Sequence, residues 1–190
     1  VDTPASFSPS LALTLAFALA LVAGFLLKAW LTSRQIRHVA RHRQGVPATF
    51  AAHIPLQAHQ KAADYTIAKA RFGLLEMALG TAVLMGWTLM GGLDALNQAL
   101  LSWLGGGMVQ QLALLVAFAL VNGLIDLPAT LYQTFVLEQR FGFNKTTPAL
   151  WLQDLLKSTL VGAAIGLPIA ALVLWMMGAT GPYWWLWTWA

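Results

Sequence analysis

The sequence contains no cysteine and few charged side chains. Without cysteine the chain has no disulfide framework, no thiolate metal ligand and no cysteine nucleophile. Asp, Glu, Lys and Arg together make up 9% of the residues, whereas 58% are hydrophobic. A soluble domain of 190 residues cannot bury that much apolar side chain. The composition therefore excludes an ordinary soluble domain and indicates a membrane protein.

Several catalytic motifs are also missing. The sequence has no H-E-x-x-H, no G-x-S-x-G, no P-loop and no glycine-rich dinucleotide motif. His38 and His42 have the i, i+4 spacing of a zinc motif, but Val39 occupies the position where a hydrolytic site needs a glutamate base. Three neighbouring arginines would repel a divalent cation. They are Arg37, Arg41 and Arg43.

The other two histidines give no stronger signal. His53 and His59 are spaced so that they would lie on different faces of a helix. We therefore expect no catalytic residue, no metal ligand and no bound cofactor in this chain.

Four apolar segments are long enough to cross a bilayer, which takes roughly 20 residues of helix. They cover residues 11–31, 72–89, 109–137 and 150–177, and a fifth begins at Tyr183. The predicted fold is an all-α, polytopic transmembrane helix bundle with four full spans and the start of a fifth. A helix that stops after a few apolar residues leaves backbone groups unpaired in lipid, and the first residue is not methionine. We therefore expect residues 1–190 to be a fragment of a longer protein that continues after Ala190.

The basic residues indicate an orientation. All Lys and Arg lie in or beside two connections, 32–71 and 138–148, whereas the connections 90–108 and 178–182 have none. The positive-inside rule places the two basic connections in the cytoplasm and the N-terminus outside. The positive charge thus follows the topology, and no nucleic-acid partner is expected.

The second part of the first basic connection is predicted to be a helix. Ala62, Tyr65, Ala68 and Phe72 recur at helical spacing within residues 59–72. One interpretation is an amphipathic helix that lies on the membrane surface and is attracted by anionic headgroups. The other is a helix that docks against a cytoplasmic domain.

Three polar side chains lie inside the apolar segments: Glu76, Asn122 and Asp126. Ionisable groups at membrane depth are costly, so they should face protein or a watery cavity. They either form hydrogen bonds between helices or line a cavity. Both interpretations stay open from the sequence.

The third apolar segment contains a proline and the fourth contains a pair of glycines, which affect helix geometry and packing. Pro128 is expected to kink the third span. Gly162 and Gly166 form a G-x-x-x-G pattern, which usually means close helix packing within one chain.

The connection between the third and fourth segments has a distinctive sequence, YQTFVLEQRFGFNKTTP, at residues 132–148. Gly142 permits a turn, Thr147 can cap the next helix and Pro148 suits its first turn. The block resembles the signature of the CAAX prenyl protease type I family of membrane zinc metallopeptidases, in its N-terminal multi-helix membrane domain. The matching residues are Asp126, Leu127, Pro128, Tyr132, Phe135, Glu138, Gly142, Phe143 and Asn144. Residues 34–50 and 58–73 likewise resemble the first cytoplasmic loop of bacterial members.

The resemblance implies a chain that contributes spans to a membrane-embedded chamber in a bacterial inner membrane. In the family, the H-E-x-x-H helix and a later glutamate ligand lie C-terminal to this region. Zinc, the zinc-activated water that attacks a peptide bond, and the peptide or membrane-protein substrate are therefore implied for the full-length protein only. The implied partners of this chain are the lipid bilayer and its own C-terminal catalytic domain, which the loop 138–147 would support.

Two other functions fit the composition and topology. One is a non-enzymatic transporter, channel or assembly factor, with Glu76 and Asp126 as its intramembrane polar site. The other is an inactive homologue that retains only the membrane scaffold.

Overall fold

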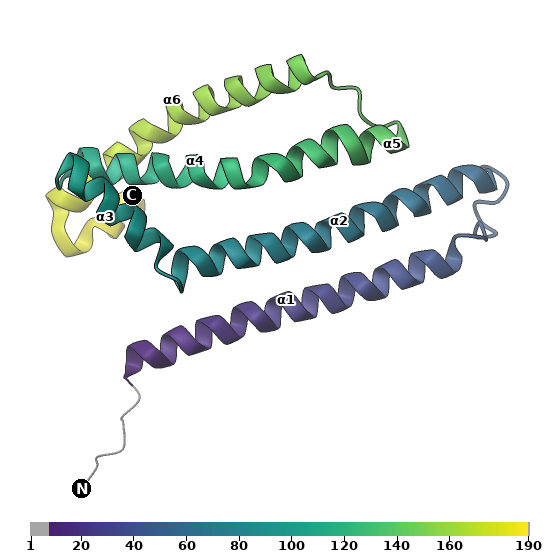
Figure 1. The fold of residues 1–190 in the computed structure, drawn as a ribbon, viewed down its shortest axis with the longest axis horizontal. Helices are drawn as coiled ribbons and strands as arrows, with labels where there is room; N and C mark the ends of the chain where they lie inside the picture. The colour runs from purple at the N-terminus through teal and green to yellow at the C-terminus, as the bar shows by residue number, and fades with distance from the viewer. Residues whose placement is uncertain (1–7, 190) are drawn as a thin grey trace, which may run out of the picture. The chain divides into compact units, whose positions relative to one another are not determined.

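The structure, a computed structural model, describes residues 8–189. All regular secondary structure in this range is helical, which confirms the predicted fold class. The elements in Figure 1 are α1 (Pro9–His42), α2 (Leu56–Thr88), α3 (Gly92–Leu104), α4 (Met108–Tyr132), the π-helix η1 (Gln133–Glu138), α5 (Gln139–Phe141), α6 (Pro148–Thr180), the 3-10 helix η2 (Gly181–Tyr183) and α7 (Trp184–Trp189).

The helices belong to two compact units. The first comprises Val1–Gly92 and Leu131–Phe143, and the second comprises Leu93–Thr130 and Asn144–Ala190. The boundary therefore falls within α4, after Thr130. In the first unit α1 and α2 lie side by side and antiparallel (Figure 1).

Three helical stretches are long and apolar enough to cross a membrane. They are Pro9–His42, Met108–Phe141 and Pro148–Thr180, which contain the apolar segments predicted first, third and fourth. The second segment reaches this standard only when α2 and α3, bent by 53° at their junction, are taken as one broken span. The described residues thus offer three spans, or four with the bent pair. The number of spans and their orientation stay predictions.

Helix boundaries follow from local sequence. The Ser8 hydroxyl accepts a hydrogen bond from the Leu11 backbone N–H at 3.3 Å and caps α1. The predicted cap of α6 is confirmed, because the Thr147 hydroxyl accepts from the Leu150 N–H at 3.2 Å and Pro148 follows in the first turn. Side-chain caps of this kind satisfy backbone donors that have no partner within the helix.

The first basic connection is more helical than expected. Residues 32–42 extend α1, and residues 56–71 form the first turns of α2, which continues without a break to Thr88. The amphipathic stretch is therefore the beginning of a longer helix, and its place on the membrane surface or against a cytoplasmic domain stays a prediction. The segment between α1 and α2 is residues 43–55, which contain Gly45 and Pro47 and end at Pro55.

Residues 90–108, expected as a plain connection, contain the helix α3. Glycines with positive φ bracket it: Gly91 at 77°, and Gly105 at 70°. These backbone conformations favour glycine and end each helix sharply. In the second unit the Gln110 side chain is 4% exposed and donates from Nε2 to Asn97 Oδ1 at 2.7 Å, which joins α4 to α3.

An apolar groove of about 590 Å³ opens between α4 and α6 in the second unit. Gly162 and Gly166 line it, and a Cβ placed on either would meet no described atom within 4 Å beyond its own helical turns. The expectation that this G-x-x-x-G pattern packs closely against another helix of the chain is therefore wrong for the described residues. The glycines instead widen the groove.

Candidate functional site

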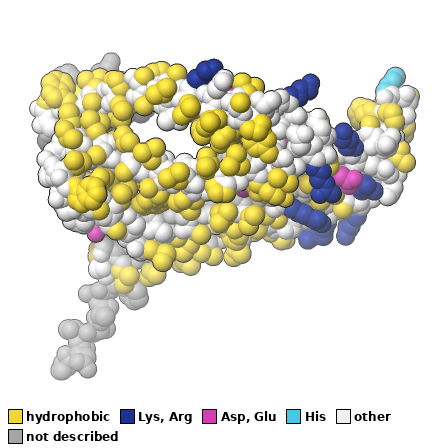
Figure 2. Space-filling view, turned by 45° about the horizontal axis from the view of Figure 1, so that its top comes forward, with side chains coloured by type: hydrophobic (Ala, Val, Ile, Leu, Met, Phe, Trp, Pro, Cys, Tyr) yellow, Lys and Arg dark blue, Asp and Glu magenta, His cyan; other side chains and the backbone are white. Residues whose placement is uncertain are grey.

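Side chains from α1, α2 and α5 meet at one end of the first unit, which we call the basic end. Dark blue Lys and Arg side chains gather there around a small magenta patch (Figure 2). The connection between α1 and α2 and the turn after α5 both lie at this end.

A tight turn ends the third apolar segment. The Phe143 N–H donates to the Glu138 carbonyl at 3.0 Å, and the Gly142 N–H donates to the Gln139 carbonyl at 3.1 Å. This pair of bonds is a Schellman motif, in which Gly142 adopts the left-handed conformation at φ 75°. The prediction that Gly142 permits the turn is confirmed.

An unusual helix precedes this turn. Residues Gln133–Glu138 form a π-helix after Pro128 in α4, and Leu137 within it is only 6% exposed. A π-helix inserts one extra residue per turn, which rotates the following side chains relative to an ideal α-helix. The segment therefore presents Phe141 and Phe143 toward α2.

Aromatic rings join the turn to α2. The Tyr65 ring contacts Phe141 edge-on, with centroids 5.3 Å apart, and Phe143 in a tilted arrangement at 4.6 Å. Phe72 and Tyr132 form a second such pair at 5.1 Å. Edge-on and tilted aromatic pairs are favourable beyond the area that they bury. Tyr132 and Phe143 of the distinctive block thus have a structural reason for their side chains, which the sequence alone did not supply.

An ion pair fastens the end of α1 to α2. The Arg43 guanidinium donates from Nε and Nη2 to the two carboxylate oxygens of Asp64, at 2.6 and 2.7 Å. The two side chains are 34% and 42% exposed, so solvent screens the pair. The hydrogen bond from Arg43 lowers the pKa of the Asp64 carboxyl, with a smaller electrostatic contribution from Arg140. The same bond raises the pKa of Arg43.

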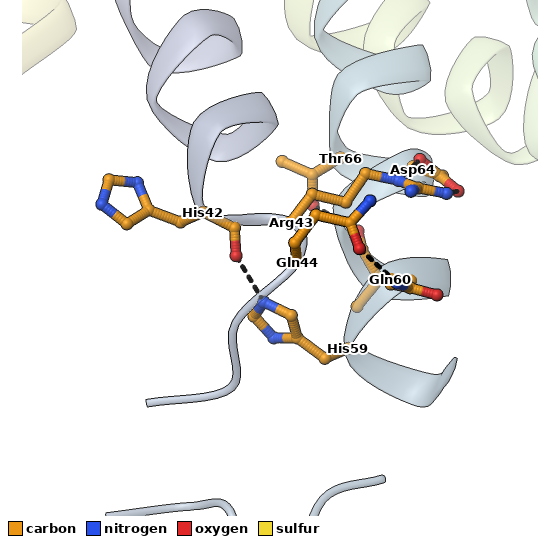
Figure 3. A network of polar contacts seen from close by, with 8 residues as sticks. His42, Arg43, Gln44, His59, Gln60, Asp64 and Thr66 are labelled. Carbon is orange, nitrogen blue, oxygen red and sulfur yellow. Dashed lines mark hydrogen bonds and ion pairs between the residues drawn. The ribbon is translucent and has the colours of Figure 1, made fainter. Parts of the chain in front are cut away.

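Three further hydrogen bonds surround this pair. His59 donates from Nε2 to the His42 carbonyl at 3.0 Å, and Gln60 donates from Nε2 to Gln44 Oε1 at 2.9 Å (Figure 3). Thr66 donates to the carbonyl of Ala62 at 2.8 Å within α2. The start of the connection is therefore held against the first turns of α2 by side chains from both segments.

The histidines lie in positions that do not suit a metal. His38 and His42 share one helix face, as predicted, with ring centroids 4.3 Å apart, but His42 donates from Nδ1 to the His38 carbonyl at 2.8 Å. His53 lies outside α2, so the helical comparison of His53 with His59 does not apply. Residues 8–189 contain no group of three or more His, Cys, Asp or Glu that could hold a metal ion. The donor set of the described chain does not fit a zinc site.

The polar residues predicted within the membrane are divided between the two units. Glu76 is half-buried in α2 and belongs to the first unit, whereas Asn122 and Asp126 belong to the second. Asn122 donates from Nδ2 to the Phe118 carbonyl at 2.7 Å within its own helix. Asp126 is exposed, and its backbone carbonyl accepts from the Thr130 hydroxyl at 3.1 Å.

Glu138 and Asn144, the loop residues expected to support a catalytic domain, have different local roles. The Glu138 carbonyl accepts the bond that closes the Schellman motif, and its side chain is half-buried. The Asn144 Oδ1 accepts from the Thr146 N–H at 2.7 Å, which forms an Asx turn just before α6.

Long apolar helices joined by a basic end define a polytopic α-helical membrane domain. The sequence of residues 35–190 matches the model of one family of membrane proteins. The chain belongs to the family described as CAAX prenyl protease N-terminal, five membrane helices. The predicted resemblance is confirmed.

Individual relatives agree with this membership. CAAX prenyl protease 1 of Saccharomyces cerevisiae is 30% identical over 163 residues, which are 80% of this chain and 36% of the relative. The CAAX prenyl protease 1 homolog of Mus musculus is 30% identical over 176 residues, which are 87% of this chain and 36% of the relative. The chain thus spans little more than a third of the curated relatives that it matches.

A solved structure has the same fold. The crystal structure of S. mikatae Ste24p superimposes with a TM-score of 0.84 and 26% sequence identity, over 92% of this chain and 41% of that protein. The helices described above therefore correspond to part of the Ste24p fold.

Proposed function

We propose that this chain is the membrane-embedded N-terminal scaffold of a zinc metalloendopeptidase similar to CAAX prenyl protease 1. The observation that carries the proposal is the match to Ste24p over 92% of the chain with a TM-score of 0.84. In this function the helices form part of an intramembrane chamber, and a catalytic domain from a later part of the same protein completes it. The resemblance to bacterial loops favours a bacterial inner membrane.

Zinc and the hydrolytic chemistry belong to the rest of the proposed enzyme. The described residues contain no suitable donor group, and His42 engages its Nδ1 with a backbone carbonyl. The substrate of the proposed enzyme is a peptide or a membrane protein. This chain forms part of the wall of the chamber and supports the catalytic domain. The apolar groove between α4 and α6 is suited to such a wall, because its lining is almost entirely Leu, Val, Ala and Gly.

The two basic connections, 32–71 and 138–148, lie on the cytoplasmic side in this proposal, with the N-terminus outside. The positive-inside rule supports this orientation. The turn at 138–143 is a firm support, because the Schellman motif fixes its backbone and Tyr65 contacts two of its rings. We assign Glu138 and Asn144 to contacts with the catalytic domain on that side.

The proposal is tested in the full-length protein with the variants Glu138→Gln and Asn144→Ala. Lys145→Gln is a matched control, because Lys145 is an exposed neighbour in the same loop. Zinc content, folded yield and cleavage of a reporter peptide are measured for all four proteins. Reduced cleavage in the two variants, with folded yield retained and the control unchanged, supports the role of the loop. Unchanged fold and cleavage in both variants would remove that role. Absence of zinc and of cleavage in the parent would favour the transporter or inactive-scaffold function.

A further inference from the structure

A second cavity lies between α1 and α2, within the first unit. Its volume is about 400 Å³. One side of the lining is polar and comes from both helices: Thr32, Gln35, Tyr65, Thr66 and Lys69. The other side is apolar and includes Gly73 and Met77. The cavity therefore changes from polar to apolar along the helix axes.

The cavity lies at the level expected for a membrane surface. On α1, the Arg34 guanidinium stacks 4.8 Å from the centre of the exposed Trp30 ring. Tryptophan and arginine near the end of an apolar segment are typical of the boundary between acyl chains and headgroups. Thr32 lies between them in the sequence. On α2, Lys69 and Arg71 are the last basic residues before the apolar segment 72–89.

Lys69 is held in place by aromatic residues. Its ammonium donates to the Tyr65 hydroxyl at 3.4 Å and lies 5.6 Å from the centre of the Tyr65 ring. Phe141 and Phe143 contact the same ring. Because the Tyr65 oxygen accepts this bond, its own hydrogen is left to donate to a ligand.

Lys69 is the charged side chain that lines the cavity. The closest acidic residue before Lys69 on α2 is Asp64, which is paired with Arg43. The next acidic residue after Lys69 is Glu76, seven residues further on, which is about 10 Å along a helix and on the apolar side. On α2 itself, therefore, no unpaired carboxylate lies within one helical turn of Lys69. The other acidic side chain on an element that contacts α2 is Glu138, which is half-buried in η1.

We propose that this cavity binds the phosphate headgroup of an anionic phospholipid. The Lys69 ammonium pairs with the phosphate, and the Tyr65 hydroxyl and Gln35 amide donate to phosphate or glycerol oxygens. The first part of an acyl chain lies over Gly73, where a Cβ would meet nothing within 4 Å. The volume is sufficient for a headgroup, since sites for small ligands start near 300 Å³. The site does not depend on the proposed enzyme function.

The test uses the full chain reconstituted with equal parts phosphatidylglycerol and phosphatidylcholine, followed by native mass spectrometry of the lipids that stay bound. Lys69→Gln removes the charge, and Tyr65→Phe removes only the hydroxyl. Arg71→Gln is the matched control, because it deletes the same charge two residues further on the same helix. Gly73→Leu is a second probe, which fills the apolar side without removing any polar group.

The expected result is preferential retention of phosphatidylglycerol by the parent. Lys69→Gln should weaken it about fivefold and Tyr65→Phe about threefold, with Gly73→Leu also weakening it and Arg71→Gln leaving it nearly unchanged. Equal losses in Lys69→Gln and Arg71→Gln would overturn the site in favour of diffuse surface attraction. Equal retention of phosphatidylcholine would also overturn it. Displacement of the lipid by millimolar inorganic phosphate, with the phosphate bound in its place, would identify a free-phosphate site and overturn the lipid assignment.

Discussion

Replacement of Tyr65 by alanine should detach the turn at residues 138–143 from α2. Tyr65 contacts the Phe141 ring at 5.3 Å and the Phe143 ring at 4.6 Å. Each aromatic pair contributes about 0.5–1.5 kcal/mol beyond the area that it buries. Tyr65→Ala should therefore lower the free energy of unfolding by about 1–3 kcal/mol. Tyr65→Phe keeps both ring contacts, so its effect should stay within about 0.5 kcal/mol.

The assay combines global and local measurements. The free energy of unfolding is measured in mixed micelles with increasing denaturing detergent, and hydrogen exchange is followed at the amides of Gly142 and Phe143. These amides close the Schellman motif, so their exchange should accelerate in Tyr65→Ala and stay slow in Tyr65→Phe. If the two variants unfolded with equal free energies and exchanged at equal rates, the aromatic contacts would not hold the turn.

Three further predictions concern the turn, the ion pair and the topology. Gly142→Ala places a Cβ at φ 75° and should cost about 1–2 kcal/mol of unfolding free energy; an equally stable variant would show that the turn can relax. The hydrogen bond from Arg43 lowers the pKa of Asp64, so the ionised pair stabilises the fold above about pH 4 and loses that effect as the pH falls through the lowered value. Asp64→Asn should therefore lose less stability than the parent on acidification, and parallel pH profiles would contradict this. Because the chain has no cysteine, Gly45→Cys and Gly106→Cys report topology cleanly. An impermeant maleimide should label Gly106→Cys in intact cells and Gly45→Cys only after permeabilisation, and the reverse pattern would invert the orientation.

Apolar run length and capping residues predict much of the fold. Three of the four predicted spans lie within helices long and apolar enough to cross a membrane, and the cap at Thr147 and the turn at Gly142 lie where the sequence places them. These features depend on residues close together in the chain. The helix α3 was missed because the connection was judged only by its lack of positive charge.

The sequence patterns could not predict contacts between segments that lie far apart in the chain. Helical spacing placed Tyr65 on the apolar face of its helix. Periodicity predicts which face is buried but not which residues contact it, and the structure shows that Tyr65 contacts Phe141 and Phe143. The ion pair between Asp64 and Arg43 likewise joins two residues that no sequence pattern links, because Arg43 lies across the connection. The G-x-x-x-G pattern was misjudged because small residues allow close packing but do not require it.

The separation of scaffold from catalysis is tested most directly with two matched purified proteins, one ending at Ala190 and one continuing to the natural stop of the gene. Zinc content and peptidase activity are measured on both. The account predicts zinc and cleavage in the longer protein only. Zinc-dependent cleavage by the shorter protein, or neither property in either protein, would contradict it.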